Sequence, residues 1–412
     1  MRSESSLRWV SWLVGGLLLA PAGACGDGEA PGANMNADGL RHEQRLQLDS
    51  VVSFAADEST IAVSVGSNPY RGGHLERVFD FNTGEELVER GAIAVYEREG
   101  DLWGQTAFLT HLTPAEGYPE LGRSLALDGN TILATNGNNI VIFEKVDSGW
   151  STVDEIESAC SPVLAIRGDI ALSGGNCPPW NPSVEVFRRT VGGWAKVQEL
   201  TASREVPGRF VTDIAFDGKT IVVGSNGGER VFVFEDKDGA FEETQVLERV
   251  PDSDPYGFGL EVEVSGDRIA VTAPGTERDG RVFIYERQGG AWVRTAMPDP
   301  LNFRDVIEWG STIALRGSRL VVGAPFERTR QAGINQIPDP RRTTSSPQYG
   351  AAYLFEEANG EWEQRYYVKS ARPERFEHFG SVVALTDNLV FIGRTGESGG
   401  HYVHVWTREE SP

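Results

Sequence analysis

Cysteine and histidine are scarce in this chain, whose 412 residues include 3 Cys and 6 His. No HExxH motif, cysteine cluster or His-rich tract is present, and these are common arrangements for holding a metal. His401 and His404 lie three residues apart on an expected strand. Side chains alternate between the two faces of a strand, so these two should point in opposite directions. The sequence therefore predicts neither a metal nor a cofactor.

An excess of basic residues is also missing. Lys and Arg number 38 against 60 Asp and Glu, which gives a net charge of −22. Nucleic acids and anionic membrane surfaces bind basic faces, so neither is an expected partner. No GxSxG elbow, P-loop or dinucleotide fingerprint is present. Catalysis is not predicted, although an enzyme that builds its site from scattered loops would leave no such motif.

Long apolar runs are absent except at residues 9–24. This run is shorter than the roughly 20 residues that a membrane-spanning helix needs. Arg2 and Arg8 precede or flank it, and small residues follow at its end, which is the organisation of an export signal. We predict a signal peptide over residues 1–24. Residues 25–39 lack any apolar run and are expected to form a flexible tether.

Residues 22–25 read Ala-Gly-Ala-Cys and resemble the bacterial lipobox, in which small residues precede an invariant cysteine. The resemblance implies that Cys25 becomes the lipid-modified N-terminus of an exported protein. The chain would then be anchored to the cell envelope, at the outer membrane or the cell surface, with the lipid as its only membrane attachment. The alternative is an ordinary signal peptide that is cut nearby and leaves Cys25 unmodified.

A short apolar segment that ends in an aromatic residue recurs seven times. The seven aromatics are Tyr96, Phe143, Phe187, Phe234, Tyr285, Phe355 and Trp406. A second aromatic follows seven residues later in six of the units, after a Gly-rich or polar turn. These are Trp103, Trp150, Trp194, Phe241, Trp292 and Trp362. An odd offset across an even loop predicts that the two aromatics of a unit face each other on a hairpin.

Another hairpin precedes each of these segments, as in VEVSGDRIAVTA (262–273) and IALRGSRLVVGA (313–324). Each unit is therefore expected to contain four strands, A to D, whose continuous apolar runs suit sheets packed on both faces. Radial packing of seven such sheets predicts an all-β, seven-bladed propeller over residues 40–412. The seventh unit lacks strand D, so residues 40–50, which resemble the other D strands, should complete it.

Two short motifs stand at fixed places in several units. Phe258-Gly259 and Phe379-Gly380 occupy one place, and Gly323-Ala324-Pro325 occupies the other. They resemble the FG-GAP repeat of integrin α-chain propellers and of many bacterial surface proteins. The resemblance implies a seven-bladed propeller with an interaction role. The calcium loops of that family do not carry over, because the A–B turns here are too short to supply about six to eight oxygen ligands.

The third unit carries Arg167-Gly168-Asp169, which spells a cell-adhesion tripeptide but stands at an expected A–B turn, so we predict a turn. Cys160 and Cys177 are equidistant from that turn and should lie opposite each other on its hairpin. Facing Cβ atoms there are about 4.5–5.5 Å apart. An even number of remaining cysteines in an exported chain then predicts a Cys160–Cys177 disulfide.

Function is expected on the face formed by the B–C and D–A connections, which vary in length while the other turns stay short. Two B–C loops are long, 66–90 and 326–349. The second has a net charge of +2 and contains Arg328, Arg330, Arg341 and Arg342 with Glu327 and Asp339. We predict a binding or adhesion scaffold that presents this face to a protein or glycan ligand. The alternative is an envelope enzyme acting on polysaccharide, with acidic residues converging in a pocket.

Overall fold

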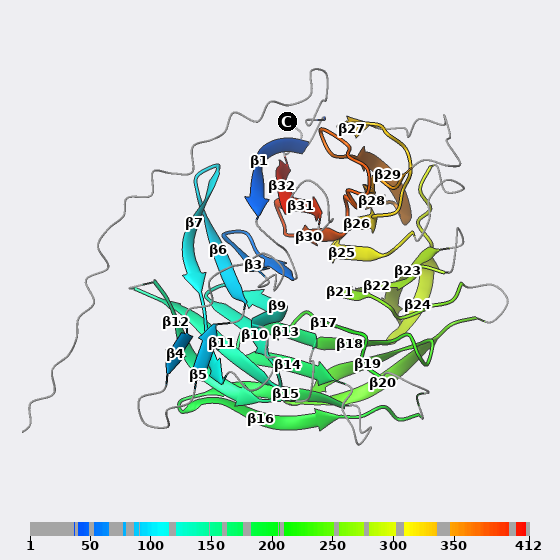
Figure 1. Ribbon diagram of the computed structural model, residues 1–412. Coiled ribbons are helices and arrows are strands. Elements are labelled where there is room, and N and C mark those ends of the chain that lie inside the picture. The colour runs from blue at the N-terminus through cyan, green and yellow to red at the C-terminus, as the bar shows by residue number, and fades with distance from the viewer. Residues whose placement is uncertain are drawn as a thin grey trace, which may run out of the picture.

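Seven small antiparallel sheets are arranged in a ring in the computed structural model (Figure 1). The structure describes residues 37, 40–48, 53–65, 77–79, 86–89, 91–114, 121–147, 149–158, 163–175, 183–204, 206, 210–250, 255–275, 280–301, 309–335, 347–394 and 401–408. Within these ranges every regular element is a strand, and no helix is long and apolar enough to cross a membrane. The predicted all-β, seven-bladed propeller is confirmed.

Each blade has four strands, and the first of them lies innermost. The first four blades are β2 (Phe54–Ala56), β3 (Thr60–Val65), β6 (Ala92–Glu99), β7 (Leu102–Leu109); β9 (Leu121–Asp128), β10 (Thr131–Asn136), β11 (Asn139–Val146), β12 (Gly149–Glu157); β13 (Val163–Arg167), β14 (Ile170–Gly175), β15 (Ser183–Thr190), β16 (Gly193–Leu200); and β17 (Asp213–Phe216), β18 (Thr220–Ser225), β19 (Arg230–Lys237), β20 (Ala240–Glu248). The last three are β21 (Val262–Ser265), β22 (Arg268–Ala273), β23 (Arg281–Gln288), β24 (Ala291–Ala296); β25 (Thr312–Arg316), β26 (Arg319–Ala324), β28 (Ala351–Ala358), β29 (Glu361–Val368); and β30 (Val382–Leu385), β31 (Leu389–Arg394), β32 (His401–Arg408) with β1 (Leu40–Leu48).

Strand β1 closes the ring, as predicted. It pairs with β32 from Leu40 opposite Arg408 to Leu48 opposite His401. Gln44 accepts a hydrogen bond from Trp103 N (2.8 Å) and donates one to Trp103 O (3.1 Å) of the first blade. Other outer strands make the same paired contact with the next blade, for example Gln245 with the backbone of Trp292. The N-terminal strand thus occupies the position of a fourth strand, and its glutamine makes the same contact with the next blade as the glutamine of another fourth strand does.

The predicted facing of the two aromatics within a unit is wrong. Trp103 lies opposite Arg98, two residues beyond Tyr96, and Trp292 lies opposite Arg287. The reason is that each two-residue turn falls one residue later than the offset assumed, which shifts the register by two. In four units the outer aromatic therefore lies opposite a long cation, and the Arg287 guanidinium lies 4.6 Å from the Trp292 ring centroid. Phe241 and Trp362 lie opposite Asp236 and Glu357 instead.

The Phe-Gly and Gly-Ala-Pro motifs form two halves of one contact between neighbouring blades. A Cβ on Gly323 of the sixth blade would lie 2.1 Å from the carbonyl oxygen of Gly380 in the seventh. Gly380 has a φ of 88°, and a Cβ there would lie 2.1 Å from Ala351 O. Only glycine permits this approach of backbone to backbone. Phe379, beside it, is fully buried. The two motifs therefore stabilise the seam between blades.

The adhesion-like tripeptide is a turn, as predicted. Arg167 lies opposite Ile170, which leaves Gly168 and Asp169 as the two turn residues. Asp128 of the preceding blade accepts a hydrogen bond from Gly168 N (2.6 Å). It also forms an ion pair with Arg167 (2.9 Å). The tripeptide is therefore part of an inter-blade clamp.

Four further strands arise from the connections. β4 (Arg77–Phe79), β5 (Glu86–Glu89) and β8 (Leu112–Pro114) form a separate three-stranded sheet, and β27 (Ile334–Asn335) extends the sixth blade beside β29. These four strands were not predicted. The predicted signal peptide, the tether with Cys25 apart from Ala37, and Cys160, Cys177, Arg341 and Arg342 lie outside the described residues. The disulfide and the lipidation remain predictions.

Candidate functional site

The two faces of the ring differ in how the strands are joined. One face carries the A–B and C–D turns, many of which contain only two residues, such as 129–130, 168–169 and 289–290. The other face, here called the loop face, carries the B–C and D–A connections. The B–C connection has 2 residues in the second blade (137–138) and 26 in the sixth (325–350). Variable loops on an invariant scaffold are typical of binding sites.

The long connection of the sixth blade starts from a buried ion pair. The side chains of Glu327 and Lys369 are both fully buried, with 2.5 Å between Oε2 and Nζ. The Glu327 carbonyl accepts hydrogen bonds from Tyr349 N (2.9 Å) and Gly350 N (3.0 Å), which close the two ends of the loop. Burial lowers the pKa of Lys369, while the Glu327 carboxylate opposes that effect. Breaking such a pair costs about 3–5 kcal/mol, so the base of the loop is rigid.

A second buried ion cluster fixes the neighbouring connection, residues 369–381. Arg394 lies 3.3 Å from Glu374 and 3.6 Å from Glu377. The Tyr402 hydroxyl is hydrogen-bonded to Glu377 and to Ser370. Burial, followed by the Glu377 charge, raises the pKa of Tyr402, so its hydroxyl stays a donor. The two connections are joined by a backbone hydrogen bond, which Lys369 N donates to Gly333 O (3.0 Å).

Two of the four predicted loop arginines can be placed. Arg330 is exposed and Arg328 is partly buried, and both follow Glu327. The structure adds two arginines that the sequence did not single out, Arg372 and Arg375, which are exposed on the adjacent connection. Along the chain, the charges of Glu374 and Glu377 balance those of these two arginines, so the sequence does not single them out. We call Arg328, Arg330, Arg372 and Arg375, with Phe376, the arginine face.

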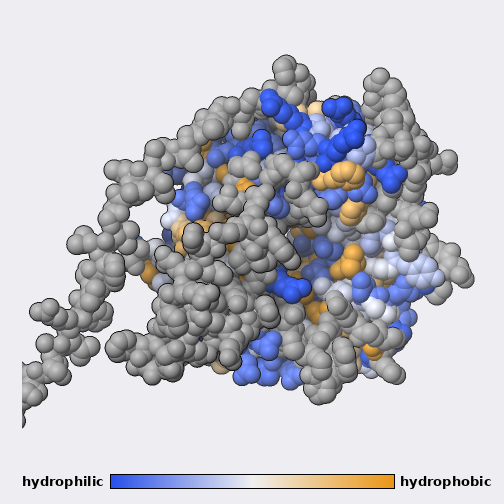
Figure 2. Space-filling view, in the orientation of Figure 1, coloured by the Kyte–Doolittle hydropathy of each residue, from blue (hydrophilic) through white to orange (hydrophobic). Residues whose placement is uncertain are grey.

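The arginine face is positive because two of its three acids are buried and the third is paired. Glu327 and Glu377 are fully buried, and Glu374 is paired with the buried Arg394. These three are the only acidic residues of segments 325–335 and 370–380, and Glu374 is the only one of them that is exposed, so the four arginines outnumber the exposed acids. Figure 2 shows hydrophilic residues gathered over the region where Figure 1 places β27, with a smaller apolar area beside them.

The centre of the ring contains one unexpected carboxylate. The middle residue of the innermost strand is alanine in six blades, and its small side chain lets neighbouring strands approach. These residues are Ala55, Ala126, Ala165, Ala215, Ala314 and Ala384. In the fifth blade Glu263 occupies this position, opposite Ala270. Burial and then the charge of Asp213 raise the pKa of Glu263 to about 8.

Two further carboxylates lie beside Glu263 but have structural partners. Asp213 accepts hydrogen bonds from Val262 N and Ile214 N, at 2.9 and 2.8 Å. Glu261 accepts from the backbone of Ile313, while burial, Asp213 and Glu263 raise its pKa well above the usual value. In other blades a serine hydroxyl makes the equivalent contact: Ser53 and Ser124 each accept a hydrogen bond from a backbone N–H of the next blade. Within the described ranges, no three His, Cys, Asp or Glu side chains form a group that could hold a metal.

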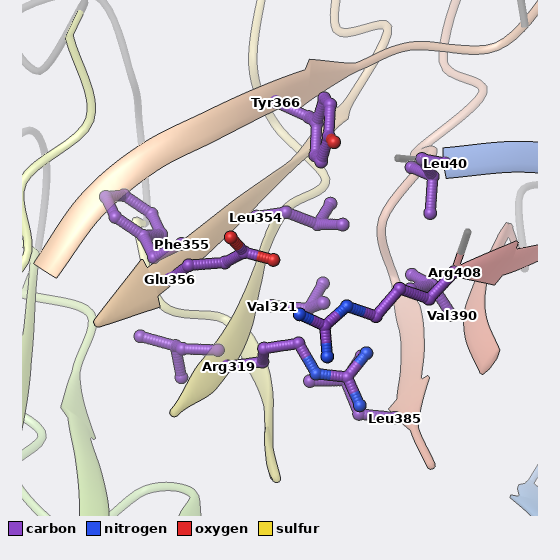
Figure 3. Close-up of a pocket in the computed structure, with 11 residues that line it drawn as sticks. Leu40, Arg319, Val321, Leu354, Phe355, Glu356, Tyr366, Leu385, Val390 and Arg408 are labelled. Atoms are coloured by element: carbon purple, nitrogen blue, oxygen red, sulfur yellow. The ribbon is translucent and has the colours of Figure 1, made fainter. Parts of the chain in front are cut away.

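A small pocket opens between the sixth and seventh blades (Figure 3). Its cavity volume is only about 20 Å³, and Leu40, Leu354, Tyr366 and Val390 supply apolar walls. Elsewhere a strand-C cation pairs across the seam, for example Lys145 with Glu97 at 2.9 Å. Here the corresponding Arg408 and Glu356 line the pocket instead, and Arg319 and Arg408 extend toward one another. At this seam Glu356 is paired with Arg365 instead, at 3.5 Å.

The two strand-C histidines do not share a site. His404 is buried, and its Nδ1 lies 2.8 Å from Nε2 of His42 on β1. Burial, His42 and nearby arginines lower the pKa of His404 well below its usual value, so this ring is neutral. The pair links β1 to β32 at the closing seam.

Comparison with known proteins agrees at the level of the fold. No family model matches the chain, and no curated protein matches it. Among solved structures, a chain of the mitotic checkpoint complex has a TM-score of 0.54 at 12% identity, covering 100% of this chain and 97% of that one. The WD40 domain of Toxoplasma gondii coronin has a TM-score of 0.49 at 7% identity, covering 91% and 88%. At such identities the first likeness supports the propeller fold and no particular activity.

Proposed function

We propose that this protein is a binding scaffold of the bacterial cell envelope that presents its loop face to a protein or glycan ligand. The observation that carries the proposal is the arginine face. Two long connections are fixed at their bases by buried ion pairs, and they display arginines on a chain of net charge −22. Because the bases of these connections are already fixed in the free protein, less conformational entropy is lost when a ligand binds the arginines. The opposite face carries short turns clamped between blades.

An envelope enzyme acting on polysaccharide is the second candidate, because Asp213, Glu261 and Glu263 converge at the centre of the ring. Raised pKa values in a carboxylate cluster are typical of acid–base catalysts. However, Asp213 and Glu261 each hold the next blade by a backbone hydrogen bond, as serines do in other blades. Glu263 alone lacks such a bond among the described residues. Binding on the loop face is therefore the better-supported function.

Lipid anchoring at Cys25 places the scaffold at the envelope in this proposal. Cells fed an alkyne-labelled fatty acid should incorporate label into the full chain and not into a Cys25→Ser variant, because attachment of the lipid requires the Cys25 thiol. Gel fluorescence after coupling to an azide dye measures this. A Cys160→Ser variant, which leaves the N-terminal segment intact, should label like the wild type. Equal labelling of the Cys25→Ser variant would refute the anchor and leave the binding proposal standing.

Shortening the long connection tests whether it contacts the partner. The deletion should replace residues 336–346 with two glycines and spare Glu327, because removing Glu327 would leave the buried Lys369 unpaired. The unfolding temperature should stay within about 2 °C, since surface loops contribute little to stability. Capture of a partner from envelope extract by the soluble 40–412 fragment should fall several-fold. Undiminished capture of the same partner would exclude residues 336–346 from the site.

A further inference from the structure

We propose that the arginine face binds an acidic polysaccharide, whose sugar rings carry carboxylate or phosphate groups. This inference rests on the proposed function, since it names the ligand class of the same face. Its starting point is the separation of charge described above. The three acids of segments 325–335 and 370–380 are buried or paired, while Arg330, Arg372 and Arg375 are exposed. A face built this way attracts anions although the protein as a whole repels them.

The chemistry of the guanidinium group indicates which anionic groups the ligand carries. All four cations of the face are arginines, and none is lysine. The planar guanidinium donates two parallel hydrogen bonds to a carboxylate or a phosphate, which a lysine ammonium does not. A chain molecule with regularly spaced anionic groups can engage several arginines at once, and each added contact increases the overall avidity.

Phe376 supports a sugar ligand. It is 54% exposed and has a φ of 59°, a left-handed conformation that aromatic residues rarely adopt. The conformation is held by a hydrogen bond from Phe376 N to Gln348 O (2.7 Å) and by burial of the next residue, Glu377. Residues held in strained conformations and displayed to solvent are often part of a binding site. An exposed ring next to Arg375 in the chain can stack on the apolar face of a pyranose.

An acidic protein partner fits less well. Stable protein interfaces usually have an apolar, aromatic-rich centre of several residues. In the described parts of the two connections that form this face, Phe376 is the only exposed large apolar side chain. The face therefore offers charge and one stacking ring, which suits a hydrated polyanionic glycan better than a protein surface.

Affinity electrophoresis and calorimetry of the 40–412 fragment test the inference. The gels contain polygalacturonate, a phosphomannan, neutral dextran or poly-glutamate. We expect retardation by polygalacturonate or phosphomannan and none by dextran, with the more strongly retarding polymer identifying the anionic group. Combining Arg330→Glu, Arg372→Glu and Arg375→Glu should weaken binding at least tenfold. Arg123→Glu, which reverses an exposed arginine in the second blade, should change it less than twofold.

Phe376→Ala separates a sugar ligand from a generic anion. It should weaken polygalacturonate binding several-fold and leave any weak retention by poly-glutamate unchanged. Equal binding of poly-glutamate and polygalacturonate, both insensitive to Phe376→Ala, would show a nonspecific charge effect and overturn the inference. Absence of binding to both acidic polysaccharides would also overturn it. In either case, partner capture from envelope extract that still depends on the loop face would leave the proposed function intact.

Discussion

Deleting residues 40–48 should remove most of the stability of the propeller. Leu40, Leu46 and Leu48 are each no more than 4% exposed, and burying a leucine contributes about 1.5–3 kcal/mol. The deletion also leaves β32 as an uncovered edge and breaks the Gln44 contact with Trp103. A folded domain has only about 5–15 kcal/mol to lose. We expect a truncated protein that aggregates or melts far below the wild type by circular dichroism.

A rearranged chain controls for simple misfolding. Moving residues 40–48 to the C-terminus, joined after Arg408 by a short Gly-containing turn, restores the order of strands seen in the other blades. This permuted protein should melt close to the wild type. Within the intact chain, Gln44→Ala should cost about 1–3 kcal/mol in urea unfolding, because it leaves two backbone groups without partners. Gln105→Ala, an exposed residue of β7, should cost almost nothing. A truncated protein as stable as the wild type would show that β1 does not close the ring.

Replacing Glu263 with alanine should stabilise the protein at alkaline pH. The pKa of Glu263 in the folded chain is about 8, against an ordinary value of 4.5. The fold therefore opposes ionisation, and the wild type loses stability as the pH rises from about 4.5 to about 8. The loss cannot exceed about 1.4 kcal/mol per pH unit. Because the carboxyl retains some contact with solvent, we expect a gain of about 2–4 kcal/mol for Glu263→Ala at pH 8, and little gain at pH 4.

Urea unfolding at pH 4, 6, 8 and 9 measures this difference. Glu263→Gln preserves the shape and removes the charge, so it should share the gain at high pH. Asp238→Asn, which removes an exposed acid from a C–D turn, should follow the wild type. Asp213 and Glu261 remain in every variant, so some pH dependence should persist. Curves for Glu263→Ala and the wild type that stay parallel from pH 4 to 9 would contradict a buried, protonated Glu263.

Much of the fold could be predicted from repetition. Seven aromatic segments and the hairpins before them were enough for the blade count, and the missing seventh D strand was enough for the role of residues 40–50. The facing of Trp103 and Tyr96 was predicted incorrectly, because the position of a two-residue turn cannot be fixed to one residue from composition. The sheet of β4, β5 and β8 was missed, since its strands are only three or four residues long.

The site was predicted only in part, for physical reasons. Arg328 and Arg330 were found because their loop is long. Arg372 and Arg375 were missed because burial of Glu377, and pairing of Glu374 with Arg394, depend on tertiary contacts. Glu263 could have been found. Aligning VEVSG (262–266) with IALRG (313–317) and the other innermost strands shows glutamate where six blades have alanine.

Site-specific photo-crosslinking tests most directly whether the loop face is the binding face. A photo-reactive phenylalanine analogue in place of Phe376 or Tyr256 reports on the loop face, and one in place of Val191 or Leu102 reports on the opposite face. All four side chains are at least half exposed, so substitution should leave the fold intact. After irradiation with envelope extract, we expect covalent adducts from Phe376 and Tyr256 and none from Val191 and Leu102. Adducts that form only at Val191 and Leu102 would show that the partner binds the clamped turns, and would contradict a binding site on the loop face.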